Sequence, residues 1–289
     1  NSVGADHGAI VTGIIAGNNN GSGIVGVAPS AALHISDFNY WSPGIWDNLV
    51  DGATNAGAVV QNNSWGFDQQ YGAAGANVFV NYMNNYGLSG SQTLVAFQSI
   101  DTNSDGTYDI GVSNTPVSWT TSDWDGYISS LNNFQSNGGI VVFALSNDDT
   151  KTDADISAAL PELFSDLQEA WIAVANVDLP TGATNHVLYS APCGSTAEYC
   201  MSADGYDIVG LAADGTGTDY YWSGVSGSSF SAPQISGAVA ILAEAFPNHS
   251  AEEITDRLLA SANNVIGFTQ TGSVTFGNGV VHGYSNEAG

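Results

Sequence analysis

Three short motifs place a hydroxyl, an imidazole and an amide where they could act together in nucleophilic catalysis. The first, Gly227–Pro233, has the sequence Gly-Ser-Ser-Phe-Ser-Ala-Pro and leads into an apolar run typical of a buried helix. Ser229 then lies at the start of that helix, where backbone amides lack an acceptor and the helix dipole favours negative charge. Its hydroxyl is a candidate nucleophile whose reaction would leave an oxyanion beside those amides. Taken alone, the motif also fits an ordinary serine N-cap.

A histidine and an asparagine could supply the other two groups. His7 opens the segment 7–17, whose apolar residues recur with helical spacing, so a helix would hold His7 in a fixed place. A histidine held in this way can take the proton of a neighbouring hydroxyl as a general base. Asn147 follows the apolar run Ile140–Leu145, which predicts a strand covered on both faces. Open α/β sheets place their sites at the carboxyl ends of strands, so the Asn147 amide could donate to an oxyanion there.

The elements that must position these groups alternate between short apolar runs and helical patterns. A helix start is predicted at Pro43, and a capping-box signature at Ser250 precedes another helix. This alternation is typical of a mostly parallel sheet with crossover helices, so the fold class is α/β. The predicted strands are Leu33–Ile35, Ala58–Val60, Ile140–Leu145 and Trp171–Val177.

One stretch departs from this alternation. Residues 67–124 are rich in Asn, Gly, Ser and aromatic residues and show no clear helical period. We interpret this stretch as an insertion on the main sheet, partly hairpin, rather than as a domain of its own. The whole of 1–289 is therefore expected to be one domain.

The charge of the chain excludes several classes of partner. There are 28 acidic residues against two basic ones, Lys151 and Arg257, which gives a formal net charge of −26. Nucleic acids and anionic membranes require basic patches, so neither is expected as a partner. No stretch reaches the roughly 18 apolar residues of a membrane span, and none is expected. The acidic residues are scattered, which indicates an acidic globular surface suited to a salty or calcium-rich exterior.

The two cysteines, Cys193 and Cys200, lie seven positions apart in a stretch rich in Gly and Ser. An even count and a local pair favour a disulfide formed in an oxidising compartment. The spacing matches no common zinc pattern, because a zinc site would need further cysteine or histidine ligands nearby.

In their order along the chain, these motifs resemble those of the subtilisin-like serine peptidases. His7-Gly8 opens a helix, Gly26–Pro29 and Asn63–Gly66 follow, and the Asn147 strand end and the serine motif come last. The resemblance covers nearly the whole chain outside the insertion. It implies the three-layer subtilisin-like fold, in which a mostly parallel central sheet carries helices on both faces.

The resemblance also implies a role for each of these residues. Ser229 would attack the scissile carbonyl and form an acyl-enzyme, His7 would carry the proton, and Asn147 would hold the oxyanion. Ser64, Trp65 and Gly66 would bind an extended substrate by strand addition. The implied function is that of a secreted endopeptidase acting on proteins or peptides, with no cofactor needed for catalysis.

Further features resemble the autotransporter-type branch of this family, which is found on bacterial surfaces. They are the small loop closed by Cys193 and Cys200, the Phe230 and Gln234 of the serine motif, and the tail 276–281. The resemblance implies an extracellular or bacterial cell-surface location.

One part of the family pattern is missing from these residues. In the order Asp, His, Ser, the Asp should precede the His by roughly 30 residues, whereas six residues precede His7. Asp6 adjoins His7, and adjacent residues on a helix do not face each other. We therefore expect the Asp, together with the first core strand, to come from an upstream segment, such as a cleaved N-terminal segment or propeptide. The alternative is a non-catalytic surface scaffold or adhesin that keeps the fold without this Asp.

Two loops are candidates for structural calcium. In the first, oxygen-bearing side chains stand at positions 1, 3, 5 and 9 with Gly at position 6, as in the front half of an EF-hand loop; they are Asp101, Asn103, Asp105 and Asp109. Position 12, where an EF-hand has Glu, is Val112, so a solvated hairpin turn is the alternative. In the second loop, the family resemblance implies that Asn20 provides a side-chain oxygen, and a Gly/Asn turn is the alternative.

Overall fold

The computed structural model describes residues 3–36, 43–67, 78–99, 111–112, 115–116, 118–180, 182, 184–211, 221–264, 267 and 269–289. Its helices are α1 (Val3–Ala16), α2 (Pro43–Asn55), α3 (Val78–Tyr86), α4 (Gly90–Phe97), α5 (Thr121–Ser136), α6 (Leu160–Leu163), α7 (Ser228–Ala245) and α8 (Ala251–Leu259), with 3-10 turns at Ser165–Ala170 and Gly194–Tyr199. Its strands are β1 (Val60–Asn63), β2 (Gly111–Val112), β3 (Thr115–Pro116), β4 (Ile140–Ala144), β5 (Trp171–Asp178), β6 (Val187–Leu188), β7 (Cys200–Asp204), β8 (Ile208–Leu211), β9 (Tyr221–Val225), β10 (Gly272–Thr275) and β11 (Val281–Tyr284).

The central sheet is mostly parallel, as the sequence predicts. β1 pairs with β4, β4 with β5, and β5 with β7, all in parallel register. The short β6 lies antiparallel to β5. Because parallel strands end at one edge, the residues that follow β1 and β4 come together at the carboxyl edge of this sheet.

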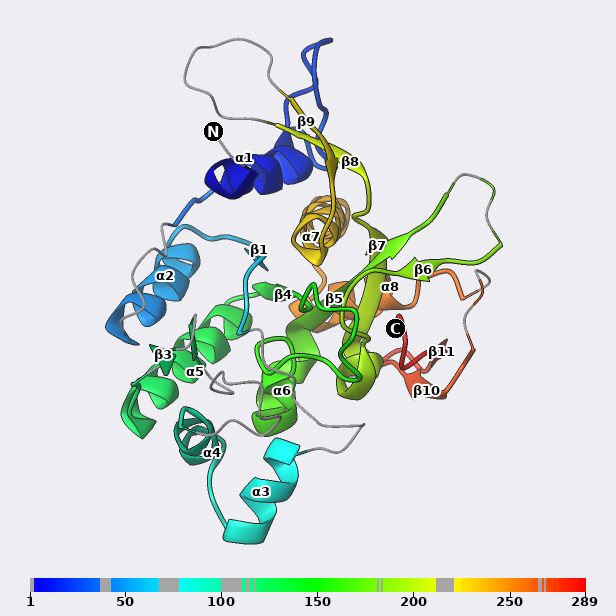
Figure 1. Ribbon diagram of the computed structural model, residues 1–289. Helices are drawn as coiled ribbons and strands as arrows, with labels where there is room; N and C mark the ends of the chain where they lie inside the picture. Colours follow the sequence, from blue (N-terminus) through cyan, green and yellow to red (C-terminus); the bar gives the residue numbers. More distant parts are fainter. Residues whose placement is uncertain are drawn as a thin grey trace.

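Helices cover both faces of the sheet (Figure 1). Val141 and Phe143 of β4 pack in one core with α2 and α5, and Ile140 and Val142 pack in a second core with α7 and α8. Alternate residues of a strand point to opposite faces, so the continuous apolar run of β4 serves both cores. This arrangement confirms the expected three-layer α/β fold.

Most elements that the sequence predicted are present. The strands predicted at 140–145 and 171–177 are β4 and β5, and the predicted helix at Pro43 is α2. Ser250 caps α8 through the predicted capping box with Glu253. Cys193 and Cys200 form the predicted disulfide.

Three predicted positions were wrong. Leu33–Ile35 is not a strand, because none of the described strands pairs with it. β1 occupies Val60–Asn63 rather than Ala58–Val60, since its pairing with β4 begins at Val60. The helix that carries His7 begins already at Val3, so His7 lies in its second turn and not at its start.

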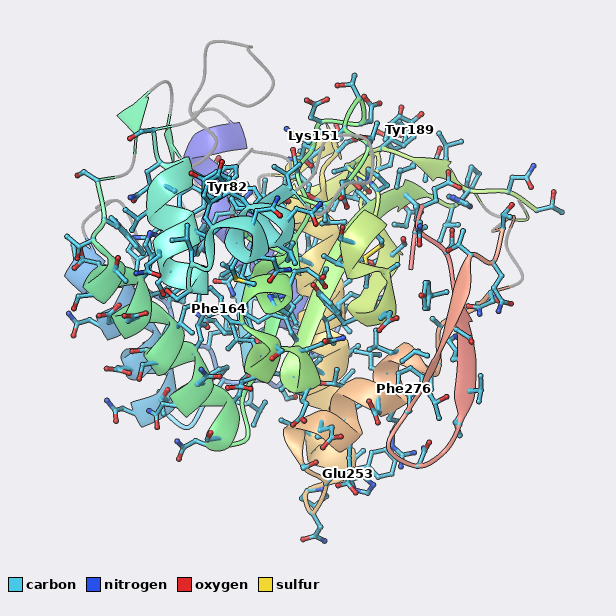
Figure 2. All side chains as sticks on the ribbon, turned by 90° about the horizontal axis from the view of Figure 1, so that it is seen from below. Tyr82, Lys151, Phe164, Tyr189, Glu253 and Phe276 are labelled. Atoms are coloured by element: carbon cyan, nitrogen blue, oxygen red, sulfur yellow. A yellow bond between two sulfur atoms is a disulfide. The ribbon has the colours of Figure 1, made fainter. Side chains whose placement is uncertain are left out.

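The stretch 67–124 holds more regular structure than its composition suggested. It contains α3, α4 and the antiparallel pair β2–β3, and Ser89 caps α4 with a capping box. The rings of Phe79 and Phe97 stack 3.9 Å apart and join α3 to α4. Tyr82 of α3, which is labelled in Figure 2, packs edge-on against Phe97 at 5.2 Å. Sequence reasoning missed both helices. The description of this stretch as an insertion in a single domain stays a prediction.

None of the helices in the described ranges combines the length and the apolar character that crossing a bilayer requires.

Candidate active site

The turn that leads into α7 brings Ser229 to the carboxyl edge of the sheet. Gly227 has a φ of 155°, and its N–H donates to the carbonyl of Gly205 at 2.9 Å. A Cβ on Gly227 would lie 3.1 Å from Oδ1 of Asn147, so glycine allows α7 to start close to the end of β4. Ser229 lies in the first turn of α7, where backbone N–H groups have no acceptor within the helix.

Ser229 and Ser64 are joined by two reciprocal hydrogen bonds. The Ser229 hydroxyl donates to the carbonyl oxygen of Ser64 at 3.2 Å, and the Ser64 hydroxyl donates to the carbonyl oxygen of Ser229 at 2.9 Å. These bonds fix the start of α7 against the residues that follow β1. The Ser229 side chain is only half-buried, so a substrate could still reach its hydroxyl.

Asn147 is oriented by the residue next to the nucleophile. Its Oδ1 accepts from the backbone N–H of Ser228 at 2.8 Å and from the Ser228 hydroxyl at 3.0 Å. The same hydroxyl contacts the carbonyl oxygen of Leu145. Because Oδ1 is engaged on the protein side, Nδ2 is the part of the exposed amide that can donate to a substrate oxyanion.

His7 lies beside α7 but does not contact the Ser229 hydroxyl. Its ring packs against Phe230 with the centroids 5.7 Å apart. Partial burial lowers the pKa of His7 below its usual value, which favours the neutral imidazole that a general base needs. Within the described ranges, no carboxylate forms an ion pair with His7, and the Ser229 hydroxyl donates to Ser64 instead.

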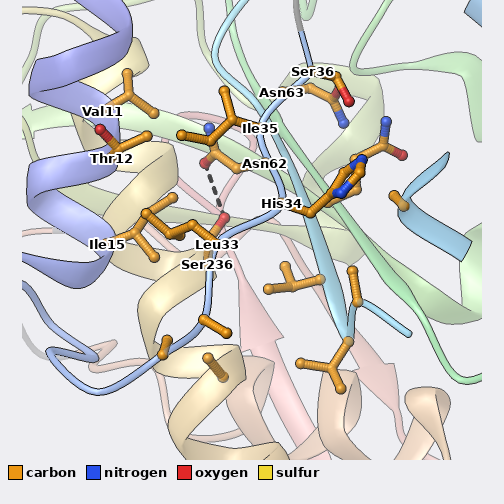
Figure 3. A pocket seen from close by; sticks show the side chains of 18 of the residues that line it. Val11, Thr12, Ile15, Leu33, His34, Ile35, Ser36, Asn62, Asn63 and Ser236 are labelled. Carbon is orange, nitrogen blue, oxygen red and sulfur yellow. Dashed lines mark hydrogen bonds between the residues drawn. The ribbon is translucent and has the colours of Figure 1, made fainter. Parts of the chain in front are cut away.

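Asn62, which sequence reasoning missed, connects the substrate edge to α7. Its Nδ2 donates to the Ser64 hydroxyl at 2.9 Å, and its Oδ1 accepts from the Ser236 hydroxyl at 2.9 Å (Figure 3). The hydrogen bonds therefore run from α7 through β1 and back to Ser229. The signal in the sequence was the polar run Gln61–Asn63 after two valines in a short strand, and the partner of Asn62, Ser236, is 174 positions away.

The segment Ser64, Trp65 and Gly66 was predicted to bind substrate. This segment follows β1 directly and lies at the carboxyl edge beside Ser229. The Trp65 ring, however, packs against Trp46 at 4.2 Å and Phe143 at 5.1 Å, so it belongs to the core. Any contact with substrate would therefore use the backbone of this segment and the exposed Gly66.

The buried carboxylate of Asp155 connects the segments that follow β4 and β1, and sequence reasoning missed it as well. Asp155 accepts from the backbone N–H groups of Ser146 at 2.7 Å, Ser157 at 3.0 Å and Ala158 at 3.2 Å. The Ser157 hydroxyl accepts from the N–H of Phe67 at 2.7 Å. The hydrogen bonds therefore connect the end of β4 to the segment after β1. Burial raises the pKa of Asp155 to about 7, although these hydrogen bonds act in the opposite direction.

The calcium hypotheses receive no support from the described residues. Oδ1 of Asn20 accepts from the N–H of Ser22 at 3.1 Å and closes a turn at the surface. Within the described ranges, no group of three or more His, Cys, Asp or Glu residues could hold a metal ion. The loop that contains Asn20 therefore does not by itself fit a calcium site. The other candidates, Asp101, Asn103, Asp105 and Asp109, lie outside the described residues.

A hydroxyl at a helix start, an oriented amide and a histidine with a lowered pKa are the kinds of group that a serine hydrolase uses. Residues 2–279 match the model of the Subtilase family, and the chain belongs to this family. By family, the chain is thus a subtilisin-like serine peptidase.

Curated relatives agree with this assignment. The extracellular serine protease of Serratia marcescens is 28% identical over 296 residues, which cover 91% of this chain and 27% of that protein. The autotransporter lipoprotein NalP of Neisseria meningitidis is 26% identical over 275 residues, covering 89% and 23% respectively. The chain thus spans about a quarter of the length of these relatives. Their names confirm the expected extracellular or bacterial cell-surface location.

Solved structures share the fold at low sequence identity. Fervidolysin from Fervidobacterium pennivorans, a keratinolytic enzyme related to subtilisin, superposes with a TM-score of 0.55 at 20% identity, covering 97% of this chain and 34% of that one. The S41 psychrophilic protease has a TM-score of 0.58 at 16% identity, covering 98% and 75%.

Proposed function

We propose that this chain is the catalytic part of a secreted serine endopeptidase that hydrolyses proteins or peptides through an acyl-enzyme on Ser229. The observation that carries the proposal is the orientation of Asn147. Its Oδ1 is engaged by Ser228, next to the nucleophile, which leaves Nδ2 to donate at the same edge. A structural Asn in a turn has no need for this arrangement, whereas an oxyanion donor must be held in this way.

The proposed reaction uses groups of the chain itself. The Ser229 hydroxyl leaves its hydrogen bond to the Ser64 carbonyl oxygen. Its oxygen then attacks the carbonyl carbon of the scissile bond while its proton passes to His7. The negative charge that forms on the carbonyl oxygen is stabilised by Nδ2 of Asn147 and by the backbone N–H of Ser229. His7 then gives the proton to the leaving amine as the C–N bond breaks. Water repeats the same steps on the ester, releasing the acid and restoring Ser229.

A histidine base also needs a partner that orients its ring and stabilises its protonated form. None of the described carboxylates pairs with His7. We therefore infer that the partner is the carboxylate expected from an upstream segment, such as a cleaved N-terminal segment or propeptide. The net charge of −26 would in addition attract basic protein substrates.

Intact-mass labelling with a fluorophosphonate tests this function. We expect a single adduct on the folded protein, lost in Ser229→Ala and retained in Ser136→Ala, which removes an exposed serine at the end of α5. Incubation over hours allows for slow reaction while His7 lacks a carboxylate. Absence of any adduct on protein shown to be folded by circular dichroism would contradict the proposal and favour the scaffold alternative.

A further inference from the structure

One asparagine lies inside a strand that is paired on both edges. Asn176 of β5 is 0% exposed, and so are Val174, Ala175 and Val177 around it. β5 pairs in parallel with β4 on one edge and with β7 on the other. Burying an amide at such a position costs free energy unless groups of the protein bind it. The partners of the Asn176 amide therefore decide what this residue does.

The amide of Asn176 joins three segments of the chain. Its Oδ1 accepts from the backbone N–H of Gly205 at 2.9 Å and lies 3.3 Å from the hydroxyl of Ser231. Because a backbone N–H can only donate, the group that faces Gly205 is the oxygen, which fixes the orientation of the amide. Nδ2 therefore points to the carbonyl oxygen of Tyr189, which is 3.5 Å away and is labelled in Figure 2. The segments that follow β6 and β7 and the first turn of α7 thus meet at one buried side chain.

Gly205 connects this amide to the turn before Ser229. Its carbonyl oxygen accepts from the N–H of Gly227 at 2.9 Å. A Cβ on Gly205 would lie 2.6 Å from the carbonyl oxygen of Gly227, so glycine allows this close approach. Gly227 precedes Ser229 by two positions and Ser231 follows it by two. Asn176 therefore holds the chain on both sides of the candidate nucleophile.

A second contact limits the effect that the loss of this amide would have. Nε2 of Gln234 donates to the carbonyl oxygen of Asp204 and, at 2.9 Å, to that of Phe230. It joins the loop after β7 to α7 independently of Asn176. Without the Asn176 amide, the turn should therefore shift and not come apart.

Gln98 is a buried amide with a different set of partners. It is 4% exposed, and its Oε1 and Nε2 bind the N–H and the carbonyl oxygen of Trp119 at 2.9 and 2.8 Å. Both of these groups belong to one residue between α4 and α5, so the bonds fix a local connection. The Asn176 amide instead reaches residues that flank Ser229 on either side.

We propose that Asn176 is a positioning residue that sets the placement of the first turn of α7 relative to β4. This inference rests on the proposed function, in which the Ser229 N–H and Nδ2 of Asn147 stabilise one oxyanion. The two donors come from α7 and from the end of β4, so they point to one place only if α7 is held at the right depth. Ser64 holds the turn from the side of β1, and Asn176 holds it from the side of β5 and β7. A displacement of about 1 Å in such a site can cost about 10²-fold in rate.

Two alanine variants test this assignment as a matched pair. Asn176→Ala and Gln98→Ala each remove a buried amide that binds backbone groups, so both should lower the melting temperature. In Asn176→Ala the N–H of Gly205 loses its acceptor, and the amides of Gly205 and Gly227 should exchange with solvent at least about tenfold faster. In Gln98→Ala the amide of Trp119 should exchange faster, whereas those of Gly205 and Gly227 should not change. Two-dimensional NMR of ¹⁵N-labelled protein measures each amide separately.

The labelling of Ser229 separates positioning from stability. At a temperature where both variants are folded, Asn176→Ala should lower the rate constant of fluorophosphonate labelling by about 10–10²-fold. Gln98→Ala should label at the wild-type rate. Asn176→Asp keeps an acceptor oxygen towards Gly205 and should recover most of the lost rate. Equal slowing in the two alanine variants, or no slowing in Asn176→Ala, would overturn the proposal.

A milder variant keeps the test open if Asn176→Ala does not fold. Ser231→Ala removes only the direct contact between the Asn176 amide and α7. Labelling should slow in this variant while the amide of Gly205 stays protected. Unchanged labelling in folded Ser231→Ala would overturn the proposal.

Failure of the proposed function would give a different pattern, because Ser229 would then stay unlabelled in the wild type. On such a protein, faster exchange at Gly227 in Asn176→Ala would uphold the positioning of the turn. Unchanged exchange at Gly227 would refute it. Labelling of the wild type that is equally fast in Asn176→Ala would uphold the proposed function and refute the role of Asn176.

Discussion

The substitution Asp155→Asn gives the sharpest prediction about the hydrogen bonds that support the candidate active site. Asp155 is 1% exposed, and burial raises the pKa of its carboxyl from 3.8 to about 7. The folded protein therefore binds a proton at Asp155 more tightly than the unfolded chain does. Its contribution to stability is present in full below pH 3.8 and is lost as the pH rises towards 7.

The magnitude of this effect follows from the size of the shift. Each pH unit between the two pKa values changes the free energy of unfolding by about 1.4 kcal/mol. From about pH 5 to about pH 7 the wild-type protein should lose about 2 kcal/mol through this one carboxyl, since the slope weakens as the pH nears 7. Asparagine cannot titrate, so Asp155→Asn removes this slope. It also replaces one acceptor oxygen by a donor facing backbone N–H groups, which lowers stability at every pH by about 1–3 kcal/mol.

Urea unfolding followed by tryptophan fluorescence at constant ionic strength, from about pH 5 to about pH 8, measures the difference. The stability advantage of the wild type over Asp155→Asn should shrink as the pH rises. Asp149→Asn, which changes an exposed carboxylate two residues after Asn147, controls for general charge effects and should follow the wild-type curve. A constant advantage across this range, or one that grows with pH, would refute the assignment of a raised pKa to Asp155.

Four further predictions concern the site and its supports. Asn147→Ala should slow fluorophosphonate labelling by the factor of about 10²–10³ that one oxyanion donor contributes in subtilisin, a member of this family, without changing the melting temperature. The rate of fluorophosphonate labelling should fall at low pH with a midpoint below 6.5, because burial lowers the pKa of His7, and a midpoint above 6.5 would contradict this. Replacing Cys193 and Cys200 by serine should lower stability in urea by about 2–3 kcal/mol, as expected for a loop of this length. If the loop containing Asp105 binds calcium, EDTA should lower the melting temperature of the wild type, and Asp105→Asn should abolish that difference; equal shifts in both proteins would refute the calcium site.

The sequence predicted the elements whose signals are local. The apolar run of β4 is continuous because both of its faces are covered, and Ser250 caps α8 through residues only three positions away. Ser229 and Asn147 were proposed as site residues because they lie at the ends of such elements, and their roles stay predictions. Leu33–Ile35 was wrongly predicted as a strand, since pairing depends on a neighbour that is distant in the sequence.

Other parts of the site could not be predicted from single residues. Asp155 and Asn62 look like ordinary polar residues in the sequence, and their roles arise from backbone groups and side chains brought together by the fold. The helices α3 and α4 were missed because polar and glycine residues obscure their period, while the ring stacking of Phe79 on Phe97 holds them together. Tertiary contacts decide such cases.

The central claim is that Ser229 forms an acyl-enzyme, and trapping that intermediate tests it most directly. The folded protein would be mixed with p-nitrophenyl acetate, quenched in acid, digested and analysed by mass spectrometry. The account predicts one acetyl group, located on the peptide containing Ser229, present in wild type, much reduced in Asn147→Ala and absent in Ser229→Ala. An acetyl group at another residue, or ester hydrolysis that continues unchanged in Ser229→Ala, would contradict it.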